Sequence, residues 1–352
     1  MDTLLYDLSI PAISSLQDQF AGQANFMQLM STVFDPKYAF LIYSPIAYLI
    51  DQRLGKKLIL TTVIAEWLNM ILKWLLHGER PYWYVHSSGH FDPQQVPIKQ
   101  FPISCELGPG HPSGHAMVTA AVWYIILDSL AQAYSTHLQS STGNGSDKAT
   151  RVSLWAAYGL LLTIVSVSRV FLGCHFPHQC LAGAILGLLV ARWVSSFDTK
   201  AMHFIGASIV LFATAFGTFG LLQLYGFDPA WTIKLATKHC VKREYIHLDT
   251  APFFSIMRYC GFALGCGLGL MIPIKGYAKQ LIPAEGQILV AGHKEPPISR
   301  NISWLSSKIV LALLMARLVD NLGLFVAHTN LGLFYSSAFI AYTLFSFAFI
   351  NL

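Results

Sequence analysis

The amino-acid sequence predicts an all-α, polytopic membrane protein with about nine transmembrane helices. Of its 352 residues, 54% are hydrophobic and only 12% are charged, whereas roughly 25% of the residues in an ordinary soluble domain carry charge. The mean hydropathy is +0.50. Apolar windows of about 20 residues, long enough for a helix to cross roughly 30 Å of hydrocarbon, recur along the whole chain. Because no repeat or low-complexity tract divides the sequence, we expect one membrane domain over residues 1–352.

The apolar windows locate the predicted spans, and polar stretches between them predict the loops. Spans are expected at residues 36–51, 57–77, 114–136, 153–172, 179–197, 203–225, 253–273, 307–327 and 330–351. The longest loops are expected at 78–112, 137–151, 226–252 and 274–306. Residues 1–30 carry several aspartates and lack the basic start and long apolar centre of a cleavable signal peptide. We therefore expect an interfacial amphipathic segment there, in contact with membrane lipid.

The basic residues indicate the orientation of the chain. A net charge of +5 is compatible with an anionic partner, but Lys and Arg in membrane proteins more often record topology, and no nucleic acid is expected as a partner. The loops after the first, third, fifth and seventh spans hold a modest excess of Lys and Arg. This bias places those loops and the C-terminus in the cytosol. The glycosylation sequons at Asn144 and Asn301 then lie on the cytosolic side, where neither acquires a glycan.

The six cysteines do not have the spacing of a metal site, because the sequence has no CxxC and no Cys/His cluster. Four of them fall in or beside predicted spans, where a cysteine usually packs as a small hydrophobe: Cys174, Cys180, Cys260 and Cys266. Cys105 and Cys240 lie in loops on the non-cytosolic side and could pair as a disulfide in an oxidising lumen.

Three polar stretches lie close to the membrane on that same side. In the first, KWLLHGERP, Lys73 and Arg80 are spaced so that a helix would place them two turns apart on one face, before Pro81 ends the helix. Taken singly, a snorkelling lysine or an arginine that flanks a span would explain either residue without a function. Together they direct two cations to one surface.

The second stretch is GPGHPSGHAM. Pro112, Ser113 and Gly114 directly precede an apolar run, which predicts a helix start with Ser113 near the N-cap. Free backbone N–H groups and the helix dipole favour an anion such as phosphate at that position. His115 falls in the first turn beside it. Ser113 alone would be an ordinary cap, but His111 and His115 on either side favour a functional site.

The third stretch is SRVFLGCHFPHQ. Arg169 ends the fourth predicted span, His175 lies in a short connection, and Pro177 biases the residue before it away from helix. Another cation and another imidazole thus reach the same surface. A lone histidine in such a turn is more often a hydrogen-bonding group at the interface, which is our interpretation of His178.

The alternation of spans brings the three stretches to one side of the membrane. Their cations, capped helix start and histidines fit a group with about two negative charges and several acceptor oxygens, which is a phosphoryl group. One histidine would attack phosphorus, and the other would protonate the leaving oxygen and then activate water. No carboxylate cluster accompanies them to hold divalent ions, so we expect a route with no metal and no other cofactor.

The motifs resemble those of a known superfamily. KxxxxxxRP at Lys73, PSGH at Pro112 and SRxxxxxH at Ser168 resemble the three signature blocks of the type 2 phosphatidic acid phosphatases. The surrounding EWLN, RPYWYVH, KQFPISCELGPG, HFPHQ and EYIHLDTAPF are similar to sequences of the glucose-6-phosphatase catalytic subunit family, over roughly residues 35–275. The resemblance implies a catalytic core at about 57–197, with additional C-terminal spans at 203–352.

The resemblance also implies an activity and residue roles. It implies hydrolysis of glucose 6-phosphate in the lumen of the endoplasmic reticulum, supplied by a glucose-6-phosphate transporter. His175 would be the nucleophile and His115 the general acid, while phosphate would bind to Lys73, Arg80, Ser113, Gly114 and Arg169. Gln179 stands where the wider superfamily has an aspartate that orients the nucleophile, and its amide oxygen can accept the Nδ1–H. His111 stands where the family commonly has serine, which adds a titratable group beside the site.

Two other interpretations remain open. The three blocks contact only phosphate, so a lipid phosphatase or pyrophosphatase is the first alternative; a sugar phosphate needs a polar pocket, to which Tyr82, Trp83, His86 and His90 could contribute. A transporter is the second, with Glu66 and the pair Arg317 and Asp320 as its intramembrane charges. For Arg317 and Asp320, about one helical turn apart, we prefer a structural ion pair.

Overall fold

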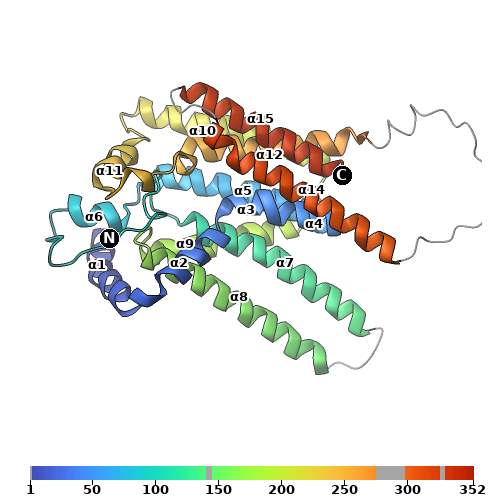
Figure 1. Cartoon of the computed structure of the whole chain (residues 1–352), viewed down its shortest axis with the longest axis horizontal. Helices are drawn as coiled ribbons and strands as arrows, with labels where there is room; N and C mark the ends of the chain where they lie inside the picture. Colours follow the sequence, from blue (N-terminus) through green and yellow to red (C-terminus); the bar gives the residue numbers. More distant parts are fainter. Residues whose placement is uncertain (1, 140–144, 275–297, 326–329) are drawn as a thin grey trace, which may run out of the picture.

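The computed structural model of the chain is a bundle of helices that run roughly along one axis (Figure 1). It describes residues 2–139, 145–274, 298–325 and 330–352, which contain helices and turns but no strand. The long helices are α5 (Gln52–Leu76), α7 (Gly114–Gln139), α8 (Gly145–Phe171), α9 (Pro177–Ser195), α10 (Ala201–Leu224), α12 (Pro252–Met271), α14 (Ile298–Phe325) and α15 (Leu331–Ile350). The shorter ones are α1 (Asp2–Gln19), α2 (Ala24–Val33), α3 (Pro36–Tyr38), α4 (Ser44–Ile50), α6 (Pro81–Ser87) and α11 (Trp231–His239).

Within the described ranges, 8 helices are long and apolar enough to cross a membrane. They correspond to the last eight predicted spans, and the all-α polytopic fold class is confirmed. The first predicted span, 36–51, is built differently, from α3, a π-helical segment Ala39–Tyr43, and α4. Pro45 has no N–H to donate to the preceding turn, which gives a physical reason for the irregular winding just before it.

The helices α7 and α9 approach each other closely because α9 places glycines against the α7 backbone. A Cβ on Gly183 would lie 2.5 Å from the Ser113 carbonyl oxygen, and a Cβ on Gly187 would lie 2.1 Å from that of Met117. Contact through small residues is a common way for membrane helices to pack. The Ser113 N–H also donates to the Gln179 carbonyl oxygen at 3.0 Å. These contacts fix the start of α7 against the start of α9.

A second close pair, α12 and α15, belongs to the C-terminal part of the chain. A Cβ on Gly265 of α12 would lie 2.0 Å from the Thr343 carbonyl oxygen of α15, and the rings of Phe262 and Phe349 pack with centroids 5.6 Å apart. One buried apolar cluster includes residues of α5, α7, α12 and α15. The predicted catalytic core and the C-terminal helices therefore share a continuous hydrophobic core.

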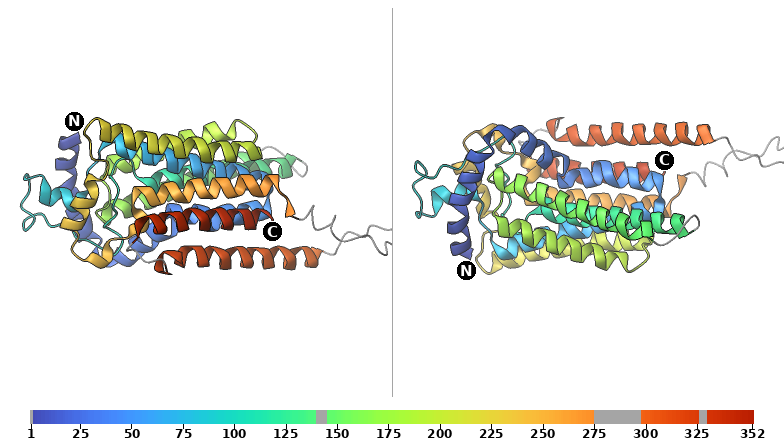
Figure 2. Two further views of the ribbon diagram at one scale, coloured as in Figure 1. Left: turned by 90° about the horizontal axis from the view of Figure 1, so that it is seen from above. Right: turned by 90° about the horizontal axis from the view of Figure 1, so that it is seen from below.

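One end of the bundle, which we call the site end, is covered by α1, α6, α11 and long loops (Figure 2). Both views show α1 lying across the bundle axis. Tyr6, Ile10 and Ile13 of α1 are buried in one cluster with Tyr82 and Trp83 of α6. One apolar face of α1 thus packs against the aromatic residues of α6, while Leu4 and Leu8 remain exposed, and the interfacial role expected for this segment stays a prediction.

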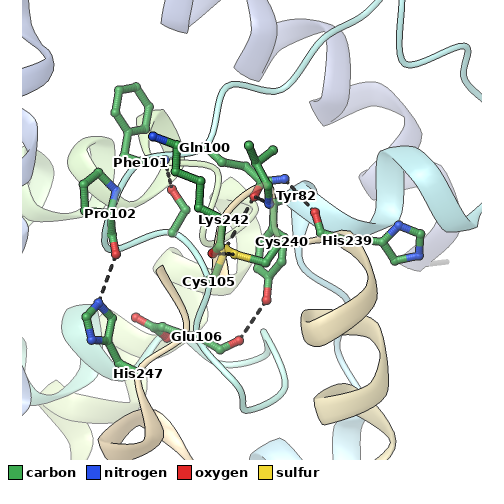
Figure 3. Close-up of a disulfide and its surroundings, with 12 residues drawn as sticks. Tyr82, Gln100, Phe101, Pro102, Cys105, Glu106, His239, Cys240, Lys242 and His247 are labelled. Atoms are coloured by element: carbon green, nitrogen blue, oxygen red, sulfur yellow. Dashed lines mark hydrogen bonds between the residues drawn. A yellow bond between two sulfur atoms is a disulfide. The ribbon is translucent and has the colours of Figure 1, made fainter. Parts of the chain in front are cut away.

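A disulfide joins Cys105 to Cys240 at the site end (Figure 3). It connects the loop that precedes α7 to the segment that follows α11. The pairing considered from the sequence is therefore present. The four other cysteines are buried and unbonded to one another, as expected for small apolar side chains: Cys174, Cys180, Cys260 and Cys266.

Candidate active site

The site end brings together residues from all three sequence blocks. Lys73 lies in the last turn of α5, Arg80 directly precedes α6, and Arg169 lies in the last turn of α8. His115 is in the first turn of α7, and His175 lies between α8 and α9. All five side chains are buried. We refer to Lys73, Arg80, His115, Arg169 and His175 as the basic cluster.

The path of the chain from Lys73 to Arg80 differs from the one predicted. The expectation that both lie on one helical face is wrong, because α5 ends at Leu76 and Arg80 has extended backbone. His77 ends the helix in the left-handed conformation, with φ of 49°. Gly78 then passes close to His111, and a Cβ on Gly78 would lie 2.6 Å from the His111 backbone nitrogen. The turn, rather than a helical face, brings the two cations together.

Arg80 is fully buried and most of its donors are occupied by backbone carbonyls. Its Nε donates to the Gly108 oxygen at 2.7 Å, and its two terminal nitrogens donate to the Cys174 and Pro109 oxygens at 3.0 and 3.1 Å. These bonds fix the plane of the guanidinium. One terminal nitrogen is also 2.9 Å from a carboxylate oxygen of Glu106.

Arg169 is held from two sides. One terminal nitrogen lies 2.5 Å from the Ser31 hydroxyl oxygen of α2, and the other pairs with the Glu106 carboxylate. Its Nε is buried without a hydrogen-bond acceptor in the part of the chain that the structure describes. Arg80 and Arg169 thus hold the two oxygens of one carboxylate between them.

The imidazole of His175 has one nitrogen fixed and the other directed into the basic cluster. Nδ1 lies 2.8 Å from the Gly110 carbonyl oxygen and 3.3 Å from the Gln179 amide oxygen, while Nε2 lies 3.3 Å from an Arg80 terminal nitrogen. A carbonyl can only accept, so this network assigns the proton to Nδ1 and leaves the lone pair on Nε2. Burial and the neighbouring Arg80 hold the pKa of His175 well below its ordinary value.

Gln179, predicted to orient His175, is itself fixed in place. Its amide nitrogen donates to the Glu79 carbonyl oxygen at 2.8 Å, and its amide oxygen accepts from the Phe176 N–H at 3.1 Å. The Gly110 carbonyl is the closer partner of His175 Nδ1, and it was not foreseen from the sequence. A backbone group of this kind leaves no signature in the residue types.

The start of α7 supplies the remaining groups. The helix begins at Gly114, and the Ser113 hydroxyl accepts from the Ala116 N–H at a long 3.5 Å. Gly114 faces Asn69, whose amide nitrogen donates to the Pro112 carbonyl oxygen at 3.1 Å. His115 lies between two carboxylates, with Nδ1 3.9 Å from Glu106 and Nε2 3.9 Å from Asp35. No sequence pattern predicted that Asp35 would lie beside His115.

Glu106 is the functional candidate that sequence reasoning missed. Its carboxylate contacts Arg80 and Arg169 and lies 3.9 Å from Nε2 of His175 and from Nδ1 of His115. Burial by itself would raise the pKa of this carboxyl, but Arg169 and Arg80 hold it well below its ordinary value. The basic cluster therefore surrounds a carboxylate anion. Glu106 stands within KQFPISCELGPG, beside Cys105, but no spacing rule connects a single loop glutamate to that cluster.

Comparison with known proteins identifies the family of this chain. A family model described as PAP2 superfamily matches residues 54–203. The chain is 35% identical over 274 residues to glucose-6-phosphatase 2 of Mus musculus, covering 76% of each chain. It is 37% identical over 286 residues to glucose-6-phosphatase catalytic subunit 1 of Haplochromis nubilus, covering 79% of this chain and 80% of the relative. It is 38% identical over 277 residues to glucose-6-phosphatase 3 of Homo sapiens, covering 78% of both.

The chain belongs to the glucose-6-phosphatase family. The predicted resemblance to that family is confirmed. No solved structure gave a significant match to the chain. The roles assigned to individual side chains of this family member remain predictions.

Two small cavities adjoin the basic cluster in this glucose-6-phosphatase relative. One, of about 70 Å³, is lined by Lys73, Glu106, Gly114 and His115 together with polar groups of Asp35, Asn69, Asp249, Thr250 and Arg258. The other, of about 130 Å³, shares Asp35, Glu106, His115, Asp249 and Thr250 and adds Arg169 and His247. Both cavities carry several polar groups beside His115, and His175 is not among the residues that line either of them.

The residues proposed from the sequence for a polar sugar pocket do not line these cavities. Tyr82 and Trp83 are fully buried, and the Tyr82 hydroxyl donates to the Glu106 carbonyl oxygen at 3.0 Å. The ring of His86 stacks on His239, and His90 pairs with Asp7 at 3.0 Å. The expectation that these residues line a sugar pocket is wrong because Tyr82 and Trp83 pack into the protein interior, where the Trp83 ring centroid lies 6.0 Å from the guanidinium carbon of Arg80.

The intramembrane charges considered for a transporter are paired. Glu66 and Arg258 form a buried ion pair at 2.7 Å between α5 and α12. Asp320 lies 3.7 Å from the exposed Arg317, but its closer partner is Lys37 at 3.0 Å. The structural ion pair expected within α14 is therefore secondary to one that joins α14 to α3.

Proposed function

We propose that this chain hydrolyses glucose 6-phosphate to glucose and inorganic phosphate through a phosphohistidine formed on His175. The observation that carries this proposal is that the basic cluster converges on a single anion, with a histidine on either side of it. The relatives named glucose-6-phosphatase support a phosphatase activity. Phosphate is an anion that such a cluster would bind and that a pair of histidines can transfer.

We assign different roles to the two histidines, on the family resemblance and on the hydrogen bonds that leave Nε2 of His175 unprotonated. Nε2 of His175 would attack phosphorus while Arg80, Arg169 and Lys73 neutralise the charge on the oxygens in the transition state. His115 would give its proton to the leaving oxygen of glucose, then take a proton from the water that cleaves the phosphorus–nitrogen bond. That second step releases inorganic phosphate and restores neutral His175. At the start of α7, Gly114 would add its backbone N–H and Ser113 its hydroxyl, because the Ser113 N–H already donates to the Gln179 carbonyl oxygen.

The sugar would occupy the cavity of about 70 Å³ beside His115. Asp35, Asn69, Asp249 and Thr250 provide carboxylate, amide and hydroxyl groups there, and such groups suit the hydroxyls of a hexose better than an acyl chain. No step needs a metal or another cofactor, because the cations of the cluster take the place of divalent ions.

The location follows from the charge bias together with the family. We place the multi-pass protein in the endoplasmic reticulum membrane, with the site end in the lumen and the C-terminus in the cytosol. Glucose 6-phosphate made in the cytosol would reach such a site only through a transporter, which is the functional partner we propose.

The decisive experiment compares substrates on the purified full-length protein. Phosphate release is measured from glucose 6-phosphate, phosphatidic acid and pyrophosphate, with His175→Ala as the blank. We expect turnover of glucose 6-phosphate to exceed the other two by at least about tenfold, which corresponds to about 1.4 kcal/mol of selectivity. A preference for phosphatidic acid or pyrophosphate would favour the other enzymes of the superfamily. Transport of phosphate esters without their hydrolysis would favour a transporter.

A further inference from the structure

The side chain of Glu106 makes its ionic contacts with the groups that the proposed function assigns to phosphate. Its two oxygens pair with Arg80 and Arg169, and both histidines lie 3.9 Å away. The backbone around it is fixed separately: its N–H donates to the Ser104 oxygen at 3.0 Å, and its carbonyl accepts from the Tyr82 hydroxyl. Cys105, the preceding residue, is anchored by the disulfide (Figure 3). The loop is therefore held in place without help from the carboxylate.

A carboxylate and a phosphoryl group cannot occupy this position together. Arg80 already donates to three backbone carbonyls and has one terminal nitrogen 3.3 Å from Nε2 of His175, and its remaining ionic partner is Glu106. A doubly charged phosphoryl group against a buried carboxylate would meet strong repulsion. A phosphoryl group also has one more free oxygen than a carboxylate, and Nε of Arg169 is a buried donor that Glu106 does not use.

We propose that Glu106 is the counter-ion of the basic cluster, and that the phosphoryl group binds by displacing its carboxylate. This inference rests on the proposed function. In the empty site the carboxylate keeps Arg80 and Arg169 neutralised and correctly spaced. When substrate arrives, the phosphoryl group takes over both arginines, and the cavity of about 130 Å³ that Glu106 also lines gives its side chain room to move. After hydrolysis the carboxylate competes with inorganic phosphate and favours its release. Glu106 is thus a positioning residue that sets the affinity of the site for phosphate.

Binding of inorganic phosphate and of vanadate to the full-length protein tests this without turnover. The thermal unfolding midpoint is followed against anion concentration for wild type and for Glu106→Gln, which removes the charge with little change in shape. We expect Glu106→Gln to bind phosphate about tenfold more tightly. Without phosphate its midpoint should fall below that of wild type, because two buried arginines lose their counter-ion. Phosphate should restore the midpoint, which it would not do if Glu106 had only a structural role.

Glu79→Gln is the matched control. Glu79 is a partly buried glutamate near the same loop, but its carboxylate accepts from the Trp83 ring N–H and not from the basic cluster. The Glu79→Gln protein should bind phosphate with an affinity within about twofold of that of wild type. This is well below the tenfold change, equal to about 1.4 kcal/mol, that we expect for Glu106→Gln. If Glu106→Gln does not fold in phosphate-free buffer, it is purified in phosphate, and Glu106→Ala is treated in the same way.

The outcomes separate this inference from the proposed function. Tighter phosphate binding by Glu106→Gln, with recovery of its thermal midpoint in phosphate, supports the role of Glu106 as a counter-ion. If wild type binds phosphate and Glu106→Gln binds it equally or more weakly, the counter-ion role is overturned and the proposed function stays intact. The same holds if neither Glu106→Gln nor Glu106→Ala folds even in phosphate. If neither wild type nor Glu106→Gln binds phosphate or vanadate, the site is not a phosphate site and both proposals fall.

Discussion

His175 and His115 differ in how the structure holds them, and this difference predicts distinct effects of their replacement. His175 has Nδ1 fixed by Gly110 and an unprotonated Nε2 that faces Arg80, so it should carry the phosphoryl group. Enzyme quenched during turnover of ³²P-labelled glucose 6-phosphate should hold acid-labile, base-stable label on His175. His175→Ala should abolish both label and hydrolysis. His115→Ala should stop glucose 6-phosphate turnover but still accept label from p-nitrophenyl phosphate, whose leaving group needs little help from an acid.

His178 serves as the internal control for that experiment. Its ring stacks on His111 and Phe176 and is not part of the basic cluster. The His178→Ala protein should therefore still carry the ³²P label on His175. Label on His115 or His178, or label retained by a folded His175→Ala protein, would overturn the assignment of roles.

The cations of the basic cluster also predict how the enzyme responds to chelators. If Lys73, Arg80 and Arg169 neutralise the phosphate, as we propose, phosphate release should be unchanged in strong chelator. Vanadate should inhibit, because it can adopt the five-coordinate geometry of the transferring phosphoryl group. Loss of activity in chelator, with rescue by magnesium or zinc, would contradict a metal-free route.

At the residue scale the sequence predicted the members of the site better than the contacts between them. The three blocks point to Lys73, Arg80, His115, Arg169 and His175 because each combines a residue type suited to phosphate with the end of a predicted span. Glu106 and the Gly110 carbonyl escaped detection. Their positions depend on how a long loop folds back, and no periodicity constrains a loop as it does a helix.

At the scale of the elements, close packing of α9 on α7 should govern both stability and activity. A Cβ on Gly187 would lie 2.1 Å from the Met117 carbonyl oxygen, so Gly187→Ala must push the two helices apart. Overpacking of this kind costs about 1–3 kcal/mol. We expect a lower thermal midpoint and reduced phosphate release, because the shift moves the start of α7 relative to His175.

Gly217→Ala in α10 is the comparison for that substitution. Apart from its chain neighbours and the backbone of its own helix, no heavy atom of the described residues lies within 4 Å of a Cβ placed on Gly217, and alanine favours helix over glycine by about 1 kcal/mol. Its midpoint should equal or exceed that of wild type. Equal losses in Gly187→Ala and Gly217→Ala would show that glycine is needed for some reason other than helix contact.

The elements themselves were largely predictable, while their interruptions were not. Length and hydropathy located the eight long helices because spanning hydrocarbon imposes a minimum apolar length. The π-helical segment before Pro45, and α1 lying across the site end, depend on tertiary contacts that hydropathy does not record. Hydropathy also gave no sign that Gly183 and Gly187 would face the backbone of α7.

At the scale of the whole molecule, the direction of each helix ties the basic cluster to one side of the membrane. The starts of α7 and α9 and the ends of α5 and α8 lie at the site end, whereas α14 begins and α15 ends at the opposite end (Figure 1). The sequon at Asn301 belongs to the start of α14. The sequon at Asn144 begins just outside the described residues, in the connection from α7 to α8. Every member of the basic cluster must therefore face the side opposite to Asn301.

Glycosylation tests this orientation in cells that have an endoplasmic reticulum. Neither Asn144 nor Asn301 should carry a glycan if the site end faces the lumen. A positive control is the double substitution Gln95→Asn with Pro97→Thr, which creates a sequon from two exposed positions in the loop after α6. That variant should show a mass shift sensitive to glycosidase, because this loop extends beyond the bundle at the site end (Figure 1).

A shift in the wild-type protein that Asn144→Gln or Asn301→Gln removes would reverse the orientation and put the basic cluster in the cytosol. Glucose 6-phosphate would then reach the site without a transporter, so the proposed partner would lose its role even if the hydrolytic activity stood.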